Sequence, residues 1–342
     1  MATFPLTHGH RHNILCYSYQ KNRNIVSIDL IVAFAKLIPI TIILENAVPQ
    51  PTIITRFAPS PTGYLHLGHA YSALAAADFA KRNKGVLLLR LEDIDSTRCK
   101  PDFSDAILED LSWLGIVWHG EVRVQSEHMA DYRAALETLK AKALAYPCFC
   151  TRKQIKVEIE KSPAAPHGPE GHHYPGTCKK LSCGEIEDRL SRGEDHCWRL
   201  DTAKAVVELK ASHHWPLTWH DSIAGEQIAA PESLGDVVLA RKDTPTSYHL
   251  SVTVDDALQN ITDVVRGEDL FHTTHIHRLL QALLGLATPN YHHHELMVDE
   301  SGKRFAKRDK AKTLKSIREE GMSAHNVIAL CNCADTQNGK LP

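Results

Sequence analysis

The chain has 342 residues, a length that suits one elaborated domain or about two ordinary ones. Its 39 basic and 41 acidic residues leave a formal net charge of -2, which excludes a basic field over the whole surface. Any surface for nucleic acid must therefore be a local patch. Four of the nine cysteines fall between Cys148 and Cys183. In a long chain of mixed composition this clustering favours a metal site or free thiols over a disulfide framework.

The first fifty residues differ in character from the rest of the chain. Residues 25–44 are mostly apolar and long enough to cross a bilayer, but they include Asp29, Lys36 and Pro39. A charge near the middle of a span costs about 3 kcal/mol on insertion, and no small-residue cleavage site of a signal peptide follows. We therefore expect residues 1–50 to be a poorly ordered extension of a cytoplasmic chain that has no membrane partner.

Beyond the extension, strand and helix patterns alternate. A β-branched run at 52–55 predicts a strand, and the Ala-rich residues 70–84 predict a helix that Gly85 ends. The continuous apolar run at 85–93 is typical of a buried parallel strand. Strand, helix and strand in this order form a βαβ unit, so the sequence predicts the α/β fold class.

The remainder of the chain predicts more helices and a second part of the sheet. Residues 146–184 are rich in Pro, Gly, His and Cys, which indicates an insertion without a core of its own. Apolar runs separated by turn residues at 237–270 indicate further strands. Amphipathic or helix-forming patterns predict helices at 104–116, where Ser104 is the expected N-cap, at 128–145 and at 272–285.

The turn between the first strand and the first helix carries an unusual set of residues. Pro59 and Gly63 restrict its path, and Gly68 allows a ligand to approach the backbone closely. The helix that follows presents free N–H groups and the positive end of its dipole to anions, and His66 and His69 add hydrogen-bond donors there. The turn is therefore expected to bind a phosphorylated ligand beyond the strand ends; the alternative is an ordinary turn with histidines satisfied in place.

These residues resemble the signatures of class I aminoacyl-tRNA synthetases. HLGH at 66–69 is similar to their adenylate-forming signature, and RFAPSPTG at 56–63 with LRLEDID at 89–95 is similar to the glutamyl and glutaminyl branch. The resemblance covers about 52–314 and implies a Rossmann-type catalytic domain that binds ATP, with Mg²⁺. It implies that His66, Gly68 and His69 bind ATP and that both histidines are catalytic.

A second signature of the class, a lysine-rich loop, has its counterpart in GKRFAKRD at 302–309. Lys307 is retained, and the resemblance implies that it binds ATP and stabilises charge developing on the phosphates. Arg304 stands where the family usually has Lys, and Ala306 stands where it usually has Ser. These departures keep the charge but remove one hydroxyl. Taken alone, the stretch would be interpreted as a solvated basic surface.

The resemblance also implies a glutamate pocket. A glutamate side chain presents a carboxylate that suits an Arg fork, and Arg56 is implied to pair with it. Glu92 is implied to hold the α-ammonium group, and Tyr248 and Arg266 match two further contacts. Each of these residues also has a structural alternative, such as a salt bridge between Arg266 and a nearby carboxylate. The complete implied set is Arg56, Phe57, Ala58, Pro59, Ser60, Glu92, Tyr248 and Arg266.

The cysteine cluster predicts a structural zinc site. Cys148, Cys150 and Cys178 supply three thiolates, the ligands that zinc prefers in closed sites, and a fourth ligand is required. Chemistry alone favours a histidine or Cys183 among the nearby candidates, which are His167, His172, His173, Tyr174 and Cys183. The pattern Cys-x-Cys followed by Tyr-x-x-x-Cys resembles the zinc site of the glutamyl-Q tRNA(Asp) synthetase family, which implies Tyr174. Unmetallated loop thiols are the alternative.

Chain length distinguishes two branches of the resemblance. Only residues 308–342 follow Lys307, too few for the anticodon-binding domain of a full glutamyl-tRNA synthetase. We expect a catalytic domain at 51–325, with an insertion at about 116–200 whose zinc site spans 148–178, and a short C-terminal tail at 326–342. This organisation is similar to the short glutamyl-Q tRNA(Asp) synthetases, which lack the anticodon-binding domain.

That family activates L-glutamate with ATP without needing tRNA and transfers it to the queuosine base of tRNA(Asp). The partners implied here are therefore glutamate, ATP and queuosine-bearing tRNA(Asp). The chain is expected to be a monomer. Three alternatives stay open. The chain is a truncated glutamyl-tRNA synthetase that charges tRNA(Glu), a non-catalytic synthetase-like protein that binds tRNA, or an unrelated nucleotidyltransferase that shares the fold.

Overall fold

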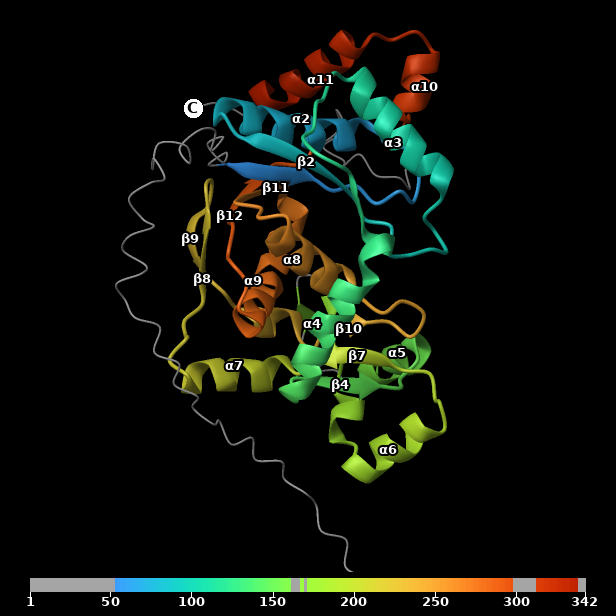
Figure 1. Cartoon of the computed structure of the whole chain (residues 1–342), viewed down its shortest axis with the longest axis vertical. Helices are drawn as coiled ribbons and strands as arrows, with labels where there is room; N and C mark the ends of the chain where they lie inside the picture. The colour runs from blue at the N-terminus through green and yellow to red at the C-terminus, as the bar shows by residue number, and fades with distance from the viewer. Residues whose placement is uncertain (1–52, 161–166, 169–170, 298–311, 338–342) are drawn as a thin grey trace, which may run out of the picture. The chain divides into compact units, whose positions relative to one another are not determined.

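The computed structural model describes residues 53–160, 167–168, 171–297 and 312–337 (Figure 1). The extension at 1–50 and the basic stretch at 302–309, with Lys307, lie outside the described residues. Within the described residues, no helix is long and apolar enough to cross a membrane.

The predicted βαβ unit is confirmed. Strand β1 (Ile54–Phe57) pairs in parallel with β2 (Val86–Leu91), and α2 (Leu67–Arg82) connects them. β2 also pairs in parallel with the short β3 (Arg123–Val124). Helix α2 lies on the sheet through a face of small side chains, Ala70, Ala73, Ala76 and Ala80, all buried. The Ala-rich sequence therefore allows the helix backbone to lie close to the strands.

A second sheet continues the first at the edge of β1. Strand β11 (Asp263–Gly267) pairs in parallel with β12 (Asn290–His294), which is followed in the sheet by β8 (Thr218–Asp221) and β9 (Gly225–Ile228). The Thr262 N–H donates to the Ile54 carbonyl (2.9 Å), and Arg56 reaches the Val265 carbonyl. β1 and β11 therefore run side by side in the same direction, and their carboxyl ends meet at one edge.

Both faces of this sheet are covered (Figure 1). On one face, Leu87, Leu89 and Val265 pack with α2. On the other, Leu88 and Val264 pack with α8 (Tyr248–Leu258) and α9 (Thr273–Leu284). Burial on both faces explains why residues 86–89 of β2 are apolar without alternation, as the sequence indicated. Helices α3 (Pro101–Trp113), α10 (Leu314–Glu319) and α11 (Ala324–Gln337) contribute to the same core cluster as α2, and α4 (Met129–Ala141) packs with α8 and α9.

A smaller antiparallel sheet holds the cysteine-rich region. β4 (Ala145–Cys148) and β10 (Val238–Ala240) flank β7 (Cys197–Leu200), and a two-stranded sheet pairs β5 (His167–Gly168) with β6 (Gly171–His172). The associated helices are α5 (Arg152–Glu160), α6 (Cys183–Ser191) and α7 (Thr202–Ala211). Contrary to expectation, residues 146–184 contribute to a small core of their own, which includes Cys148, Phe149 and Cys178.

Two further details differ from the sequence expectations. Ser104 does not cap α3, because the helix begins at Pro101 with Lys100 as the N-cap residue. Residues 248–258, interpreted as part of a run of strands, form the helix α8, in which Leu250–Asp256 are all buried, so its sequence shows no amphipathic helical pattern. The small sheet also includes a strand beyond the insertion expected at about 116–200, because β10 (Val238–Ala240) pairs with β7.

The C-terminal residues are also better integrated than a short tail. Helix α11 begins at Ala324 and continues to Gln337, through most of the range that was expected to be a tail at 326–342. Val327 and Cys331 are buried in the same core cluster as the Ala-rich face of α2. The apolar residues Val327 and Cys331 of α11 therefore pack with α2 and belong to the core.

Candidate active site and metal centre

A cavity of about 570 Å³ lies where the carboxyl ends of β1 and β11 meet the N-terminus of α2. A larger cavity of about 710 Å³, between α2, α11 and residues 114–117, contains no residue that the sequence assigned to ATP or glutamate. The smaller one is lined by every such residue that the structure describes: Arg56, Phe57, Ala58, Pro59, Ser60, His66, Gly68, His69, Glu92, Tyr248 and Arg266. Residues up to 210 positions apart in the sequence therefore surround one space.

The two histidines of HLGH cap helix α2. His66 is the N-cap residue, and its Nδ1 accepts from the Gly68 N–H (3.2 Å), while Nδ1 of His69 accepts from the His66 N–H (3.2 Å). The rings lie against each other, with centroids 3.8 Å apart. Because each Nδ1 accepts, the neutral rings carry their proton on Nε2, which makes Nε2 a donor. This capping role was not predicted from the sequence.

Arg56 lines the cavity but is also paired within the protein. Its Nε donates to Oδ1 of Asp256 (3.0 Å), and Nη2 of Arg90 donates to the same oxygen (2.6 Å). Burial would raise the pKa of Asp256, but Arg56 and Arg90 outweigh it and hold that pKa below its ordinary value. Asp256, itself held by Arg90, thus fixes the orientation of the Arg56 guanidinium at the cavity wall. Sequence reasoning missed both, although the acidic pair at 255–256 in an apolar helix was a possible signal.

Glu92 is a buried carboxyl group with incomplete internal pairing. Burial raises its pKa to about 7, against the opposing effect of Arg90 and Arg56. Its Oε1 lies 3.5 Å from Nε of Arg90, and neither atom has a hydrogen-bond partner among the described residues. A carboxylate in this situation gains from a cation that enters the cavity, which is the chemistry of an α-ammonium group.

Arg266 lines the same cavity together with Tyr248. Its Nη1 donates to the Tyr248 hydroxyl (3.4 Å), and no carboxylate of the described chain lies within ion-pair distance of the guanidinium. Burial raises the pKa of Tyr248 to about 12, so the phenol stays protonated and can itself donate. A buried guanidinium with no anionic partner, beside a phenol donor, is suited to receive a carboxylate.

Described residues flank the lysine-rich stretch at 302–309 on both sides. Lys307, Arg304 and Ala306 lie outside the described residues. Before this stretch, Met297 lines the cavity, and after it Thr313 forms a bridge with His66, while the Leu314 N–H donates to the Leu65 carbonyl (2.8 Å). The chain thus leaves and re-enters the described part beside the N-terminus of α2.

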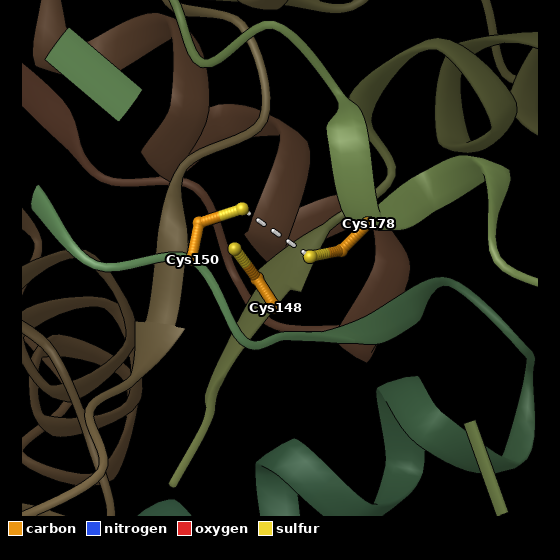
Figure 2. Close-up of side chains that lie close together, drawn as sticks. All are labelled: Cys148, Cys150 and Cys178. Atoms are coloured by element: carbon orange, nitrogen blue, oxygen red, sulfur yellow. Dashed lines mark hydrogen bonds between the residues drawn. The ribbon is translucent and has the colours of Figure 1, made fainter. Parts of the chain in front are cut away.

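The three predicted cysteines converge in the small sheet (Figure 2). Cys148 ends β4, Cys150 follows it, and Cys178 lies in a short 3₁₀ helix (Thr177–Lys180). Their sulfur atoms lie within 4.8 Å of one another, and Cys150 and Cys178 are 3.4 Å apart. A hydrogen bond with Cys197, opposite on β7, lowers the pKa of the Cys148 thiol to about 4, despite burial. Three clustered sulfurs fit a structural zinc ion.

Tyr174 is the candidate fourth ligand that lies at this cluster. Its hydroxyl is 3.5 Å from Sγ of Cys150 and accepts from the Cys178 N–H (2.9 Å). His173 instead bonds the Ser233 carbonyl through Nε2 (2.7 Å), and Cys183 is exposed at the start of α6. The side chains of His167 and His172 lie outside the described residues. Among the described candidates, proximity therefore favours Tyr174.

Comparison with known proteins agrees with this architecture. Residues 52–334 match the family of class I tRNA synthetases (E and Q), catalytic domain. Glutamyl-Q tRNA(Asp) synthetase of Rhodobacter capsulatus is 46% identical over 280 residues, covering 81% of this chain and 99% of that protein. The enzyme of the same name from Nocardia farcinica is 39% identical, covering 83% of this chain and 85% of that protein.

A solved structure shows the same fold. The glutamate tRNA ligase of Elizabethkingia meningosepticum, determined in complex with its amino acid, superimposes with a TM-score of 0.66 at 27% identity. The alignment covers 82% of this chain but only 60% of that longer protein. The chain therefore belongs to the class I tRNA synthetases of the glutamyl and glutaminyl type, and within them to the glutamyl-Q tRNA(Asp) synthetases, which are ligase enzymes.

Proposed function

We propose that this protein activates L-glutamate with ATP in the absence of tRNA and transfers the glutamyl group to the queuosine base of tRNA(Asp). The observation that carries the proposal is the single cavity at the N-terminus of α2. It combines a helix terminus for phosphate with one buried carboxylate and two buried guanidinium groups for glutamate. The names of the relatives support queuosine-bearing tRNA(Asp) as the acceptor.

In the first step, a glutamate α-carboxylate oxygen attacks the α-phosphorus of ATP, and pyrophosphate leaves. No protein nucleophile is required, because the step depends on positioning and on neutralising two anions. Glu92 holds the α-ammonium group, and Arg56, Arg266 and Tyr248 hold the side-chain carboxylate. The Nε2–H groups of His66 and His69 and the ammonium group of Lys307 bind the phosphates at the positive end of the α2 dipole, and a Mg²⁺ ion would supply further neutralisation of the phosphate charge.

In the second step, a hydroxyl of the queuosine cyclopentenediol attacks the carbonyl carbon of glutamyl-adenylate. An ester bond forms, AMP leaves, and the hydroxyl proton passes to solvent. The product is therefore a modified anticodon base instead of a charged 3′ end. A zinc ion held by Cys148, Cys150, Tyr174 and Cys178 would stabilise the small sheet, with no part in the reaction.

The acceptor is tested with labelled glutamate, ATP and two preparations of tRNA(Asp), one with queuosine and one without. We expect label only on the queuosine-bearing tRNA, in an ester that mild base removes. Equal labelling of tRNA(Asp) with and without queuosine, or labelling of tRNA(Glu), would contradict the proposal and indicate a glutamate–tRNA ligase instead.

Activation is tested separately by ATP–pyrophosphate exchange with glutamate and no tRNA. Exchange above the rate without glutamate is the expected result. Binding of tRNA without any exchange would identify a non-catalytic synthetase-like protein, and exchange that requires tRNA would remove the tRNA-independent step from the proposal.

A further inference from the structure

Within the described residues, Arg266 is fully hydrogen-bonded, and its acceptors there are all uncharged. A guanidinium has five N–H groups, and the partners of Arg266 are two imidazoles, a phenol, a hydroxyl and a carbonyl. They are Nε2 of His293 (3.0 Å), Nδ1 of His277 (3.4 Å), the Tyr248 hydroxyl (3.4 Å), Oγ1 of Thr274 (2.6 Å) and the Leu270 carbonyl (3.1 Å). The positive charge is thus held in place without being neutralised.

Both imidazoles stay neutral at ordinary pH. Burial, with Arg266 nearby, lowers the pKa of His293 to about 4 and that of His277 well below its ordinary value. A protonated ring at either position would present a donor and a second positive charge to the guanidinium. The neutral rings supply lone pairs instead.

Asp221 selects the tautomer of His293. The two residues lie on neighbouring strands, β8 and β12, with side chains 1% and 2% exposed. Oδ2 of Asp221 lies 2.7 Å from Nδ1 of His293 and also accepts from the His293 backbone N–H (3.2 Å). Since an ionised carboxylate only accepts, Nδ1 carries the proton and Nε2 directs its lone pair at Nε of Arg266.

Asp221 is itself held rigidly. Its Oδ1 accepts from the backbone N–H groups of Ile223 (2.9 Å) and Ala224 (2.8 Å) in the turn after β8. Burial would raise the pKa of Asp221, but its hydrogen bonds, with His293 foremost, lower it to about 2. The carboxylate is therefore ionised wherever the enzyme would operate, and the orientation it imposes on His293 is constant.

The hydrogen bonds divide Arg266 into a fixed and an exchangeable side. Nε and Nη2 make the short bonds, to His293 and Thr274. To the described residues, Nη1 makes only the two 3.4 Å contacts, one of them with Tyr248, which lines the cavity. Long hydrogen bonds are weak, so a carboxylate in the cavity can replace them at Nη1 while the other side keeps the guanidinium plane oriented.

We propose that His293, oriented by Asp221, is a positioning residue that fixes Arg266 for the side-chain carboxylate of glutamate and thereby sets the preference for glutamate over glutamine. The proposal rests on the proposed function. A carboxylate gains the full ionic interaction with an oriented, uncompensated guanidinium, whereas a neutral carboxamide does not. Without the His293 acceptor, the guanidinium can turn away from the cavity, and the affinities for glutamate and glutamine become more alike.

Two substitutions separate orientation from folding. His293→Asn keeps a donor where Nδ1 faces Asp221 but removes the acceptor for Arg266. His293→Gln keeps an acceptor near the position of Nε2 but loses the Asp221 partner. The matched control is His292→Asn, on the same strand, where Nδ1 lies 2.6 Å from Oγ of Ser222 and the side chain does not line the cavity.

The first measurement is the calorimetric Kd for glutamate and for glutamine, with thermal unfolding as a check of folding. We expect His293→Asn to raise the glutamate Kd about tenfold or more, since a hydrogen bond to a charged group is lost. The glutamine Kd should change little, so the glutamate-to-glutamine ratio falls. His293→Gln and His292→Asn should stay within about threefold of the unmodified protein.

The second measurement is ATP–pyrophosphate exchange, where His293→Asn should raise KM for glutamate and leave KM for ATP unchanged. Equal Kd values in His293→Asn and the unmodified protein, or an equal loss for both substrates, would overturn the inference. Glutamate binding without exchange would refute only the proposed function, since the Kd ratio still decides the inference. An unmodified protein that binds no glutamate would overturn both.

Discussion

The substitution Glu92→Gln should make the ligand-free protein more stable and the glutamate complex weaker. Glu92 is 9% exposed, and its Oε1 has no hydrogen-bond partner in the described part of the chain. Burial raises its pKa from 4.5 to about 7, even with Arg90 and Arg56 acting in the opposite direction. The folded protein therefore resists the charged form, which is the form that would bind an ammonium group.

The size of the effect follows from the shift in the pKa. One pKa unit corresponds to about 1.4 kcal/mol, so ionising Glu92 in the folded state costs about 3 kcal/mol relative to the unfolded state. Between the unfolded and folded pKa values the folded state binds more protons, so this contribution lowers the free energy of unfolding as pH rises from 4.5 to about 7. The side chain introduced by Glu92→Gln is uncharged, like the protonated carboxyl, so the substitution removes this loss in the free energy of unfolding.

The assay is urea unfolding without glutamate, at about pH 8 and at about pH 5. Glu92→Gln should be more stable by about 3 kcal/mol at the higher pH and by less than about 1 kcal/mol at the lower pH, where the unmodified side chain is largely protonated. Glu121→Gln, at an exposed position, is the matched control and should show no such pH dependence.

The same variant should bind glutamate at least about tenfold more weakly at pH 8, because the ion pair with the α-ammonium group is lost. A variant that is less stable at about pH 8, or whose stability difference is equal at both pH values, would refute the reasoning. In that case Glu92 would be a structural partner of Arg90 and not a strained binding group.

Three further substitutions test the other parts of the site. Lys307→Ala should lower ATP–pyrophosphate exchange at least about tenfold with unchanged thermal stability, whereas Lys303→Ala in the same basic stretch should retain most activity; equal losses would indicate a general charge effect. Cys178→Ala should abolish zinc binding measured by atomic absorption, and Cys183→Ala, which is exposed, should keep it; retained zinc in the former would exclude the proposed ligand set. His66→Ala should lower the free energy of unfolding by about 1 kcal/mol through loss of the N-cap, and His66→Asn should restore stability but not exchange; restored exchange would limit the ring to capping.

Local patterns predicted the parts of the fold whose physics is local. The Ala-rich run formed α2 and the continuous apolar run formed β2, because one follows helix propensity and the other follows burial on both faces. Residues 248–258 were misjudged, since a short apolar run in a buried helix and in a buried strand look alike. Ser104 was misjudged as a cap because Pro101 already begins the helix.

In the site, too, local motifs revealed some residues, and partners distant in the sequence could not be predicted. Its candidate residues could be recognised because several motifs occur in the order of a known family, and the structure gathers the described ones around one cavity. The partners that orient them could not be recognised. Asp256 is 200 residues from Arg56, and Asp221 is 72 residues from His293, and no local spacing connects either pair. Cys197 contacts Cys148 only because β7 pairs with β4.

The sequence by itself predicted the chemistry. Residue types and short spacings predicted a phosphate-binding turn before a helix and three thiols for a metal, and the resemblance to a known family implied a set of charged groups for glutamate. Only the tertiary structure decided how each charge is compensated, with Arg56 paired to Asp256 and Arg266 surrounded by neutral acceptors. The physical reason is that the partner of a buried charge is set by which strands the sheet places side by side, and that order is not written in any local pattern.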